Sequence, residues 1–326
     1  MTEVSEKPLV TFALLAYKQE KFIREAVEGA FAQTYSPLEI ILSDDCSPDQ
    51  TFEIMQEMAA SYRGPHTIHV NRAPANRGLS AQIDAAVRLA KGEWIVVAAG
   101  DDISLPNRVD EHIAIANAHP DAYSSFLAPL PFGGSANNRV PLVVNQVIRF
   151  PKSLKVYGGG VLGATHAFKS AVWNTFGDLG FGIISEDWVI PFRSSLLGSV
   201  VWSDRPGVRY RVHDNSVTAN VWGTPGRHLQ SGRQIRMESN ALEAFQCDLE
   251  KAIGLGIVPK VAGQDGLQWL KQALNTNRVI LKCIEADNLG NWFSAAFKLL
   301  FCRQFIGTYG RRTHLIWKTF RSLVFR

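Results

Sequence analysis

The sequence of 326 residues has few cysteines, no long uninterrupted apolar run and no low-complexity linker, and each absence excludes a class of protein. Its four cysteines, Cys46, Cys247, Cys283 and Cys302, stand far apart without a C-x-x-C pair, which argues against a zinc ribbon and a secreted disulfide framework. No segment supplies the ~20 apolar residues of a membrane-spanning helix, and the N-terminus lacks a signal-peptide pattern. We therefore expect a cytoplasmic protein, either soluble or peripheral to a membrane.

The chain is longer than a usual single domain, so an α/β domain with a smaller appendage is expected. The formal net charge is only +4, and we expect no nucleic-acid partner. The charge is unevenly distributed, because residues 288–326 contain seven Lys or Arg and no Asp or Glu. The end of the sequence is therefore locally basic.

Apolar segments with strand and helix periodicity alternate through the first hundred residues. The expected strands are Pro8–Ala16, Leu38–Ser43, Thr67–Asn71 and Trp94–Ala98, and the expected helices are Glu20–Gln33, Ser47–Met58 and Ser80–Ala90. This alternation predicts a parallel, doubly wound sheet. Ser47-Pro48-Asp49-Gln50 has the pattern of a capping box, which predicts that the second helix is capped by Ser47.

The regular pattern weakens after Asp102. We expect a helix from Pro106 to Asn117, a loop rich in Pro and Gly from Pro129 to Pro151, and a strand at Ser199–Trp202. From about Trp222 onward the apolar spacing is helical throughout.

Two of the expected strands end in adjacent carboxylates, Asp44-Asp45 and Asp101-Asp102. Ligands of open α/β sheets bind at the carboxyl ends of strands, so the two pairs indicate one site. Neighbouring carboxylates raise each other's pKa unless water, helix N-termini or a divalent metal offsets their charge. A third acidic pair, Glu186-Asp187, and His213 complete the set, although each feature alone is also typical of a helix cap or a structural residue.

The order and spacing of these residues resemble family 2 glycosyltransferases, the inverting nucleotide-sugar enzymes of GT-A fold. The resemblance covers about Pro8 to Thr218. It is specific in the N-terminal half, at Ala16-Tyr17-Lys18-Gln19, Ile23–Glu28, Gln33-Thr34-Tyr35, Leu42–Asp49, Asn76-Arg77-Gly78-Leu79 and Ala99-Gly100-Asp101-Asp102. It is looser at Gly163–Lys169, Ser185–Trp188 with Arg193, and Tyr210–His213. Many members carry a further Asp near the position of Ala99 or Gly100, which this chain lacks.

The resemblance implies an α/β fold of GT-A type, a doubly wound mixed sheet with a C-terminal helical extension. Residues 1–222 would form the glycosyltransferase domain, with a nucleotide-binding half (1–105) and an acceptor half (106–222), and residues 223–326 a helical region. Asp187 would be the catalytic base, and Asp101, Asp102 and His213 would hold Mn²⁺ or Mg²⁺. The residues expected at the nucleotide are Ala16, Lys18, Asp44, Asp45, Asn76, Arg77, Gly78 and Asp101.

The reaction implied is transfer of a sugar, with inversion, from a donor of the UDP-hexose or dTDP-rhamnose type. The acceptor would be a hydroxyl of a glycan or lipid-linked glycan in cell-surface polysaccharide synthesis. One alternative is a nucleotidyltransferase that makes nucleotide-sugars, which would be expected to carry a Gly-rich basic loop where this chain has Ala16-Tyr17-Lys18-Gln19. The other is a non-catalytic binding module, against which the intact Asp101, Asp102 and Asp187 argue.

The last sixteen residues, if helical, gather basic residues on one side and apolar residues on the other. The basic residues are Arg311, Lys318, Arg321 and Arg326, and the apolar ones are Ile316, Phe320, Leu323 and Val324. Such a helix suits an anionic membrane surface, which would place the protein on the inner face of the plasma membrane. The alternative is a helix docked on its own domain or on a second subunit.

Overall fold

The computed structural model describes residues 7–134, 145–155, 162–180, 183, 185–213 and 230–299. The chain divides into two compact units, Met1–Asp214 and Asn215–Arg326. The strands of the first unit are β1 (Val10–Ala16), β2 (Leu38–Asp44), β3 (Thr67–Arg72), β4 (Trp94–Ala99), β5 (Ile103–Ser104), β6 (Ala122–Phe132), β7 (Gln146–Ile148), β8 (His166–Lys169) and β9 (Ser199–Arg211). Its helices are α1 (Ile23–Phe31), α2 (Thr51–Ser61), α3 (Leu79–Leu89), α4 (Arg108–Ala118), α5 (Ala171–Phe176) and α6 (Glu186–Leu197), with short 3₁₀ helices η1 (Lys152–Lys155) and η2 (Gly163–Thr165).

Within the described residues, the strands form one mixed sheet in the order β3-β2-β1-β4-β8-β6-β9-β5, with β7 paired to β9. The first four strands of this order are parallel to one another. Strand β8 runs antiparallel to both β4 and β6, and β6 is parallel to β9. The sheet therefore combines a parallel half with a mixed second half, as the resemblance implied.

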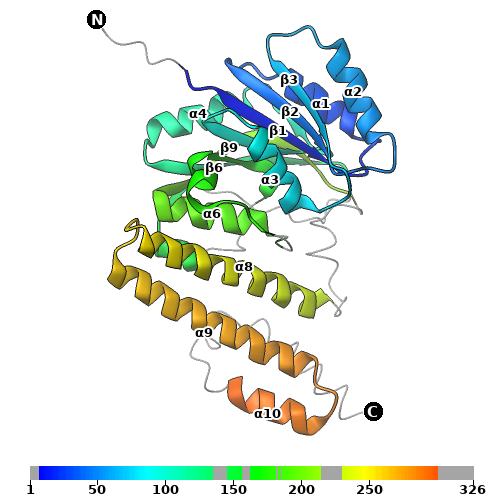
Figure 1. The fold of residues 1–326 in the computed structure, drawn as a ribbon. Coiled ribbons are helices and arrows are strands. Elements are labelled where there is room, and N and C mark those ends of the chain that lie inside the picture. The colour runs from blue at the N-terminus through cyan, green and yellow to red at the C-terminus, as the bar shows by residue number, and fades with distance from the viewer. Residues whose placement is uncertain are drawn as a thin grey trace, which may run out of the picture. The chain divides into compact units, whose positions relative to one another are not determined.

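The central parallel strands β1, β2 and β4 are predominantly apolar because both of their faces are covered, whereas the edge strand β3 is partly exposed. Every residue of β1 and of β2 is buried. One face packs against α1, α2 and α4, which contribute Val27, Met55 and Ile113 to the core. The crossover from β3 to β4 runs in the opposite direction along the sheet, and it places α3 on the other face (Figure 1).

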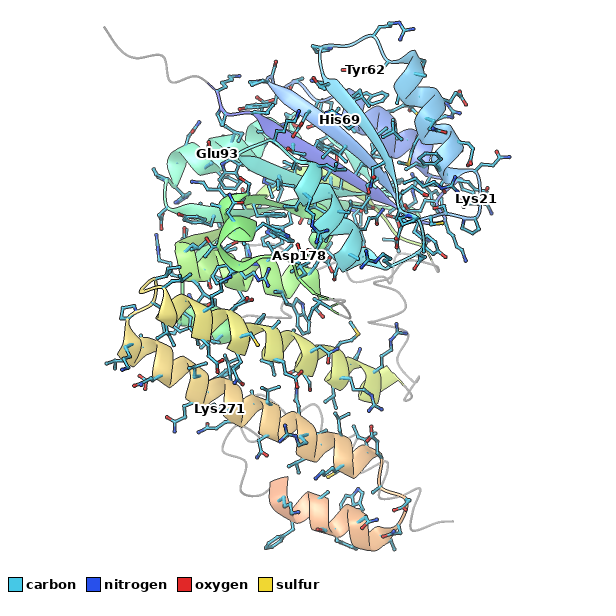
Figure 2. All side chains as sticks on the ribbon, viewed as in Figure 1. Lys21, Tyr62, His69, Glu93, Asp178 and Lys271 are labelled. Atoms are coloured by element: carbon cyan, nitrogen blue, oxygen red, sulfur yellow. The ribbon has the colours of Figure 1, made fainter. Side chains whose placement is uncertain are left out.

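Helix α3 is fastened to the segment that leads into α6. The Asp84 carboxylate accepts hydrogen bonds from the Leu179 N–H at 2.9 Å and from the Trp173 indole N–H at 3.2 Å. Burial raises the pKa of Asp84 above its usual value. Arg88, one turn further along α3, pairs with Asp178, which is labelled in Figure 2. The segment before α6 is thereby connected to α3, which packs on β1 and β2.

Three local expectations were wrong. Helix α2 begins at Thr51 rather than near Ser47, because the Ser47 hydroxyl accepts a hydrogen bond from the Lys18 N–H instead of capping the helix. Strand β6 continues through Pro129 to Phe132, where a loop was expected. Strand β9 extends well beyond Trp202 to Arg211, because irregular parallel pairing with β6 continues past Pro206.

The described part of the second unit consists of the helices α8 (Gln230–Gly254), α9 (Lys260–Ile284) and α10 (Leu289–Leu299). Helices α8 and α9 run side by side in opposite directions (Figure 1). Ile235, Ile280 and Trp292 form part of the core that joins all three helices. No helix in the described part of the chain has the length and apolarity to cross a membrane. The basic tail, Arg311–Arg326, lies outside the described residues.

Candidate active site

The carboxyl ends of β2, β1 and β4 lie next to each other at one edge of the sheet. Ala16, the last residue of β1, is in register with Asp44 of β2, and Leu15 is in register with Ala99 of β4. The Asp45 N–H donates to the Ala16 carbonyl at 3.0 Å, and the Gly100 N–H donates to the Leu15 carbonyl at 2.9 Å. The two acidic pairs therefore flank the end of β1, as the pattern of the sequence predicts.

Asp44 is fully buried and supports the turn that follows β2. Its Oδ2 atom accepts a hydrogen bond from the Ser47 N–H at 2.8 Å and lies 3.5 Å from Nε of Arg72. The Oδ1 atom of Asp44 has no hydrogen-bond partner among the described residues. One oxygen of Asp44 is therefore used by the protein, and the other has spare accepting capacity.

Asp45 clamps the turn before α3. Its Oδ1 accepts a hydrogen bond from the Arg77 N–H at 3.0 Å, and its Oδ2 accepts one from the Gly78 N–H at 2.8 Å. Gly78 has a φ of +84°, a conformation that favours glycine. Asn76 and Arg77 of this turn are exposed to solvent. Both oxygens of Asp45 already accept a hydrogen bond from this turn. Asp45 therefore holds the backbone of the turn in place, a role that the sequence did not predict.

Lys18 lies in the loop after β1. Its φ of +56° is unusual for a residue with a side chain, and its N–H donates to Ser47 Oγ at 3.0 Å. The exposed ammonium lies 5.2 Å from the centre of the Tyr17 ring. The backbone of the loop is fixed, while the cationic end of Lys18 is accessible to an anion.

Asp101 and His213 meet at the end of β4. The Nε2 atom of His213 lies 3.1 Å from Oδ2 of Asp101, and both side chains are partly exposed. Asp102 is buried, and its Oδ1 accepts a hydrogen bond from the Arg211 N–H at 2.7 Å. Arg211 Nε donates to the Asp101 carbonyl at 2.8 Å. The end of β9 is therefore joined to both carboxylate residues that follow β4.

Burial and the negative charge of Asp101 raise the pKa of Asp102 well above its usual value, against the opposing effects of the Arg211 N–H and the Arg108 charge. The Oδ2 atom of Asp102 is buried without a hydrogen-bond partner among the described residues. Such an uncompensated carboxylate oxygen, on the residue next to the one that His213 contacts, fits a hard divalent cation. Within the described ranges, however, no group of three or more His, Cys, Asp or Glu residues is already arranged to hold a metal ion.

Gly100 explains in part why the acidic motif is short here. A Cβ atom at this position would collide with Oε1 of Gln19 and would come within 3.0 Å of the Ala16 Cβ. Gln19 itself is fixed through its N–H, which donates to the Thr51 hydroxyl at 2.8 Å. A third carboxylate at position 100 would therefore require this packing to shift.

Glu186 and Asp187 occupy the first turn of α6. Glu186 is buried, and its carboxylate lies against Gly163, where an added Cβ would collide with Oε1 of Glu186. Burial and the neighbouring Asp187 raise the pKa of Glu186 well above its usual value. Desolvation raises the pKa of Asp187 from 3.8 to about 7, with hydrogen bonding to its own N–H acting in the opposite direction.

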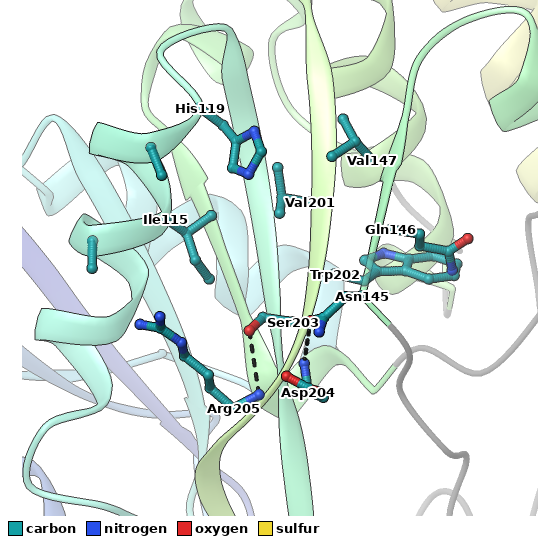
Figure 3. Close-up of a pocket in the computed structure, with 12 residues that line it drawn as sticks. Ile115, His119, Asn145, Gln146, Val147, Val201, Trp202, Ser203, Asp204 and Arg205 are labelled. Carbon is teal, nitrogen blue, oxygen red and sulfur yellow. Dashed lines mark hydrogen bonds between the residues drawn. The ribbon is translucent and has the colours of Figure 1, made fainter.

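The predicted residues thus lie in two groups. The first contains those at the ends of β1, β2 and β4 together with His213, and the second is Glu186-Asp187 next to η2. The protein also has a pocket of about 420 Å³ between α4, β7 and β9, with Ile115, Val147 and Val201 among its lining residues (Figure 3). None of the predicted site residues lines that pocket.

Comparison with known proteins assigns the first unit. Residues 11–170 match the family model described as "Glycosyl transferase family 2". A Bacillus subtilis protein, "Uncharacterized glycosyltransferase EpsJ", is 36% identical over 95 residues, 29% of this chain and 26% of that protein. "Chondroitin synthase" of Escherichia coli is 35% identical over 103 residues, 32% of this chain and 14% of the relative. The matched part spans less than half the length of each of these relatives.

Solved structures show the same fold. S. aureus TarS 1-349, determined in complex with UDP-GlcNAc, has a TM-score of 0.60 at 16% identity, over 90% of this chain and 81% of that one. The mannosyltransferase PcManGT from Pyrobaculum calidifontis, in complex with GDP-Man and Mn²⁺, has a TM-score of 0.55 at 15% identity, over 98% and 88% of the two chains. The fold is that of the GT-A glycosyltransferases. Residues 11–170 therefore form a glycosyl transferase family 2 domain.

Proposed function

We propose that the protein is an inverting glycosyltransferase that moves a sugar from a nucleotide-sugar to a hydroxyl group of a glycan or glycolipid acceptor. Support comes from one observation above all. The acidic ends of β2 and β4 flank the end of β1, and a separate acid with a raised pKa, Asp187, stands at the start of α6. A glycosyl transfer needs one group of residues that stabilises the leaving diphosphate and a separate base that removes the proton from the acceptor hydroxyl.

The nucleotide would lie along the loop after β1 and the turn before α3. Asp44 has an unpartnered oxygen that can accept a hydrogen bond from the base or ribose. Lys18 and Arg77 have exposed cationic side chains suited to phosphate oxygens. Asp45 keeps its predicted place at the nucleotide, but it would act mainly by holding the Arg77–Gly78 turn.

Asp101, Asp102 and His213 would hold Mn²⁺ or Mg²⁺. Their oxygen and imidazole donors fit such an ion, and the unpartnered Oδ2 of buried Asp102 is the atom that most needs a cation. The bound ion would stabilise negative charge on the departing nucleoside diphosphate as a Lewis acid. With few protein ligands, water would complete its coordination.

Asp187 would remove the proton from the attacking hydroxyl. A carboxyl whose pKa is about 7 is a stronger base than an ordinary aspartate and still has an ionised fraction at neutral pH. Glu186 is a poor candidate for a nucleophile, because its carboxyl is buried against Gly163 with a pKa well above the usual value. A single base without a second nucleophile is the arrangement for inversion of the anomeric centre.

The donor would be of the UDP-hexose or dTDP-rhamnose type, and the acceptor a precursor of cell-surface polysaccharide. Solved relatives of the fold bind UDP-GlcNAc and GDP-Man, which is consistent with a nucleotide-sugar donor. A cytoplasmic protein with a basic tail would meet a lipid-linked acceptor at the inner face of the plasma membrane. This localisation rests on the sequence of residues 311–326, which lie outside the described part of the chain.

A panel of UDP-, dTDP- and GDP-sugars tests the function, scored by release of nucleoside diphosphate and by thermal stabilisation with and without Mn²⁺. A bound donor stabilises the folded state by mass action, so binding is visible without turnover. A nucleotidyltransferase would instead consume a nucleoside triphosphate and a sugar 1-phosphate and release pyrophosphate. Stabilisation without any turnover would indicate a binding module.

A further inference from the structure

Arg108, the first residue of α4, is completely buried. Burying a guanidinium is costly unless its donors are satisfied, so such a residue requires a structural or functional reason. Its hydrogen bonds go to neutral oxygens. Nη1 donates to the Ser104 hydroxyl at 2.9 Å, and Nη2 donates to the carbonyls of Val97 at 2.6 Å and Ala164 at 2.7 Å. The pKa of Arg108 falls to about 9 through desolvation, which the Asp102 charge partly offsets.

The two carbonyls that share Nη2 belong to the two halves of the candidate site. Val97 lies in β4, shortly before Asp101 and Asp102. Ala164 lies in η2, directly after Gly163, whose Cα faces the Glu186 carboxylate and the Cβ of Asp187. The Nη2 atom of Arg108 therefore connects β4, which leads to Asp101 and Asp102, with η2, which contacts the start of α6.

The geometry requires an arginine. Nη2 carries two hydrogen atoms at fixed angles in the guanidinium plane, so it can donate to both carbonyls while Nη1 donates to Ser104. The Phe12 ring, with its centre 5.7 Å from the guanidinium carbon, limits movement of the group from the β1 side. A lysine would keep the charge but has a single nitrogen at the end of a flexible chain.

We propose that Arg108 is a positioning residue that sets the spacing between the carboxylates after β4 and the Glu186-Asp187 turn by bridging the carbonyls of Val97 and Ala164. This inference rests on the proposed function, in which the first group faces the diphosphate and the second faces the acceptor. Arg108 would touch neither substrate.

The spacing matters because a displacement reaction needs the acceptor oxygen, the anomeric carbon and the leaving group in line. A misplacement of about 1 Å can lower such a rate by about 10²-fold. Water is small and can attack from several positions, so donor hydrolysis depends less on the position of Asp187. Loss of the bridge should therefore lower transfer to the acceptor more than it lowers hydrolysis of the donor.

The test compares Arg108→Met and Arg108→Lys with His112→Asn. His112 is also fully buried on α4, one turn later, but its ring nitrogen bonds the Ser125 hydroxyl of β6 at 2.8 Å rather than the carbonyls of Val97 and Ala164. It therefore controls for general loss of stability in this helix. Ser104→Ala removes only the partner of Nη1 and provides a milder variant that should fold even where Arg108→Met does not.

Two readouts separate positioning from simple packing. Hydrogen exchange of the 162–165 and 185–190 segments should become at least about 10-fold faster in Arg108→Met, and should change much less in His112→Asn, whose partner Ser125 pairs with Ala167 of β8 instead. With the nucleotide-sugar that the parent protein turns over, the ratio of transfer to hydrolysis should fall by at least about 10-fold. Affinity for UDP with Mn²⁺ should stay within about three-fold, and Arg108→Lys and Ser104→Ala should be intermediate.

If the hydrogen-exchange protection of residues 162–165 were unchanged in both Arg108 variants, Arg108 would not bridge β4 and η2. Equal loss of transfer and hydrolysis, at the level seen in His112→Asn, would overturn the positioning role. If the parent protein turns over none of the donors, the proposed function fails, and the exchange experiment still decides whether Arg108 holds the two segments together.

Discussion

The Nε2 atom of His213 lies 3.1 Å from the Oδ2 atom of Asp101, although the two residues are 112 positions apart in the chain. The contact joins the end of β9 to the end of β4, beside the buried carboxylate of Asp102. The ring of Phe22, centred 5.0 Å from the imidazole, limits the orientations that His213 can adopt. An imidazole held against a carboxylate in this way is suited to share a cation with it.

We expect metal-dependent nucleotide binding to be lost in Asp102→Ala and weakened, by about 10-fold or more, in Asp101→Ala and His213→Ala. Calorimetric titration of UDP and dTDP with and without Mn²⁺ measures this effect. Asp121→Ala is the matched control, because it removes a carboxylate that pairs with Arg149 on the surface. Equal affinity of the parent protein with and without metal would show that no ion bridges the diphosphate.

Asp45→Ala should both destabilise the first unit and weaken nucleotide binding. The substitution leaves the Arg77 and Gly78 N–H groups without their carboxylate acceptor, and a hydrogen bond to a charged group is worth about 1.5–3 kcal/mol. Urea unfolding gives the change in stability, and the UDP titration gives the change in affinity. Asp45→Asn keeps one acceptor oxygen and should be intermediate. If a folded Asp45→Ala protein bound UDP with the affinity of the parent, the Arg77–Gly78 turn would not be part of the nucleotide site.

Transfer activity should rise with pH up to about 7 and then level off. Burial raises the pKa of Asp187 to about 7, so the proton is held below that pH and the basic form is present above it. The same shift makes Asp187 less favourable to folding as pH rises from 3.8 to about 7. Asp187→Asn should therefore be more thermostable than the parent above pH 7, with the difference shrinking towards pH 4. A melting-temperature difference that is independent of pH would contradict the raised pKa.

Truncation after Gly310 removes residues 311–326, which carry five of the seven basic residues counted at the end of the sequence. Transfer to a soluble acceptor should survive. Sedimentation with anionic liposomes should decrease and become less sensitive to salt, because each Lys or Arg near such a surface contributes about 1 kcal/mol. A truncated protein that binds liposomes as before, but unfolds or changes its oligomeric state, would show that the tail is structural.

The parallel half of the fold could be predicted because its central strands β1, β2 and β4 are buried on both faces and are predominantly apolar in sequence. The acidic residues that terminate Leu38–Asp44 and Trp94–Ala99 were equally visible, since carboxylates interrupt those runs abruptly. The later strands were harder to delimit. Strand β9 contains Pro206 and Gly207 and pairs irregularly with β6, so its length depends on tertiary contacts that the local sequence does not reveal.

Arg108 shows a second limit of sequence analysis. A basic residue at the start of a helix would ordinarily be expected in solvent, and no local pattern indicates that this one is buried. Its burial depends on the Ala164 carbonyl, which belongs to a segment 56 positions later. The contact of Glu186 with Gly163 is likewise non-local, although the small size of Gly163 was a visible hint that a neighbour approaches closely.

The assignment of Asp187 as the base is tested most directly by comparing sugar transfer in the parent protein and in Asp187→Asn, with the donor selected from the panel and Mn²⁺ present. Removing the proton acceptor should lower transfer by about 10² or more, while donor affinity stays within a few-fold, because the nucleotide-facing residues are unchanged. Transfer retained within about 10-fold in Asp187→Asn would contradict the account.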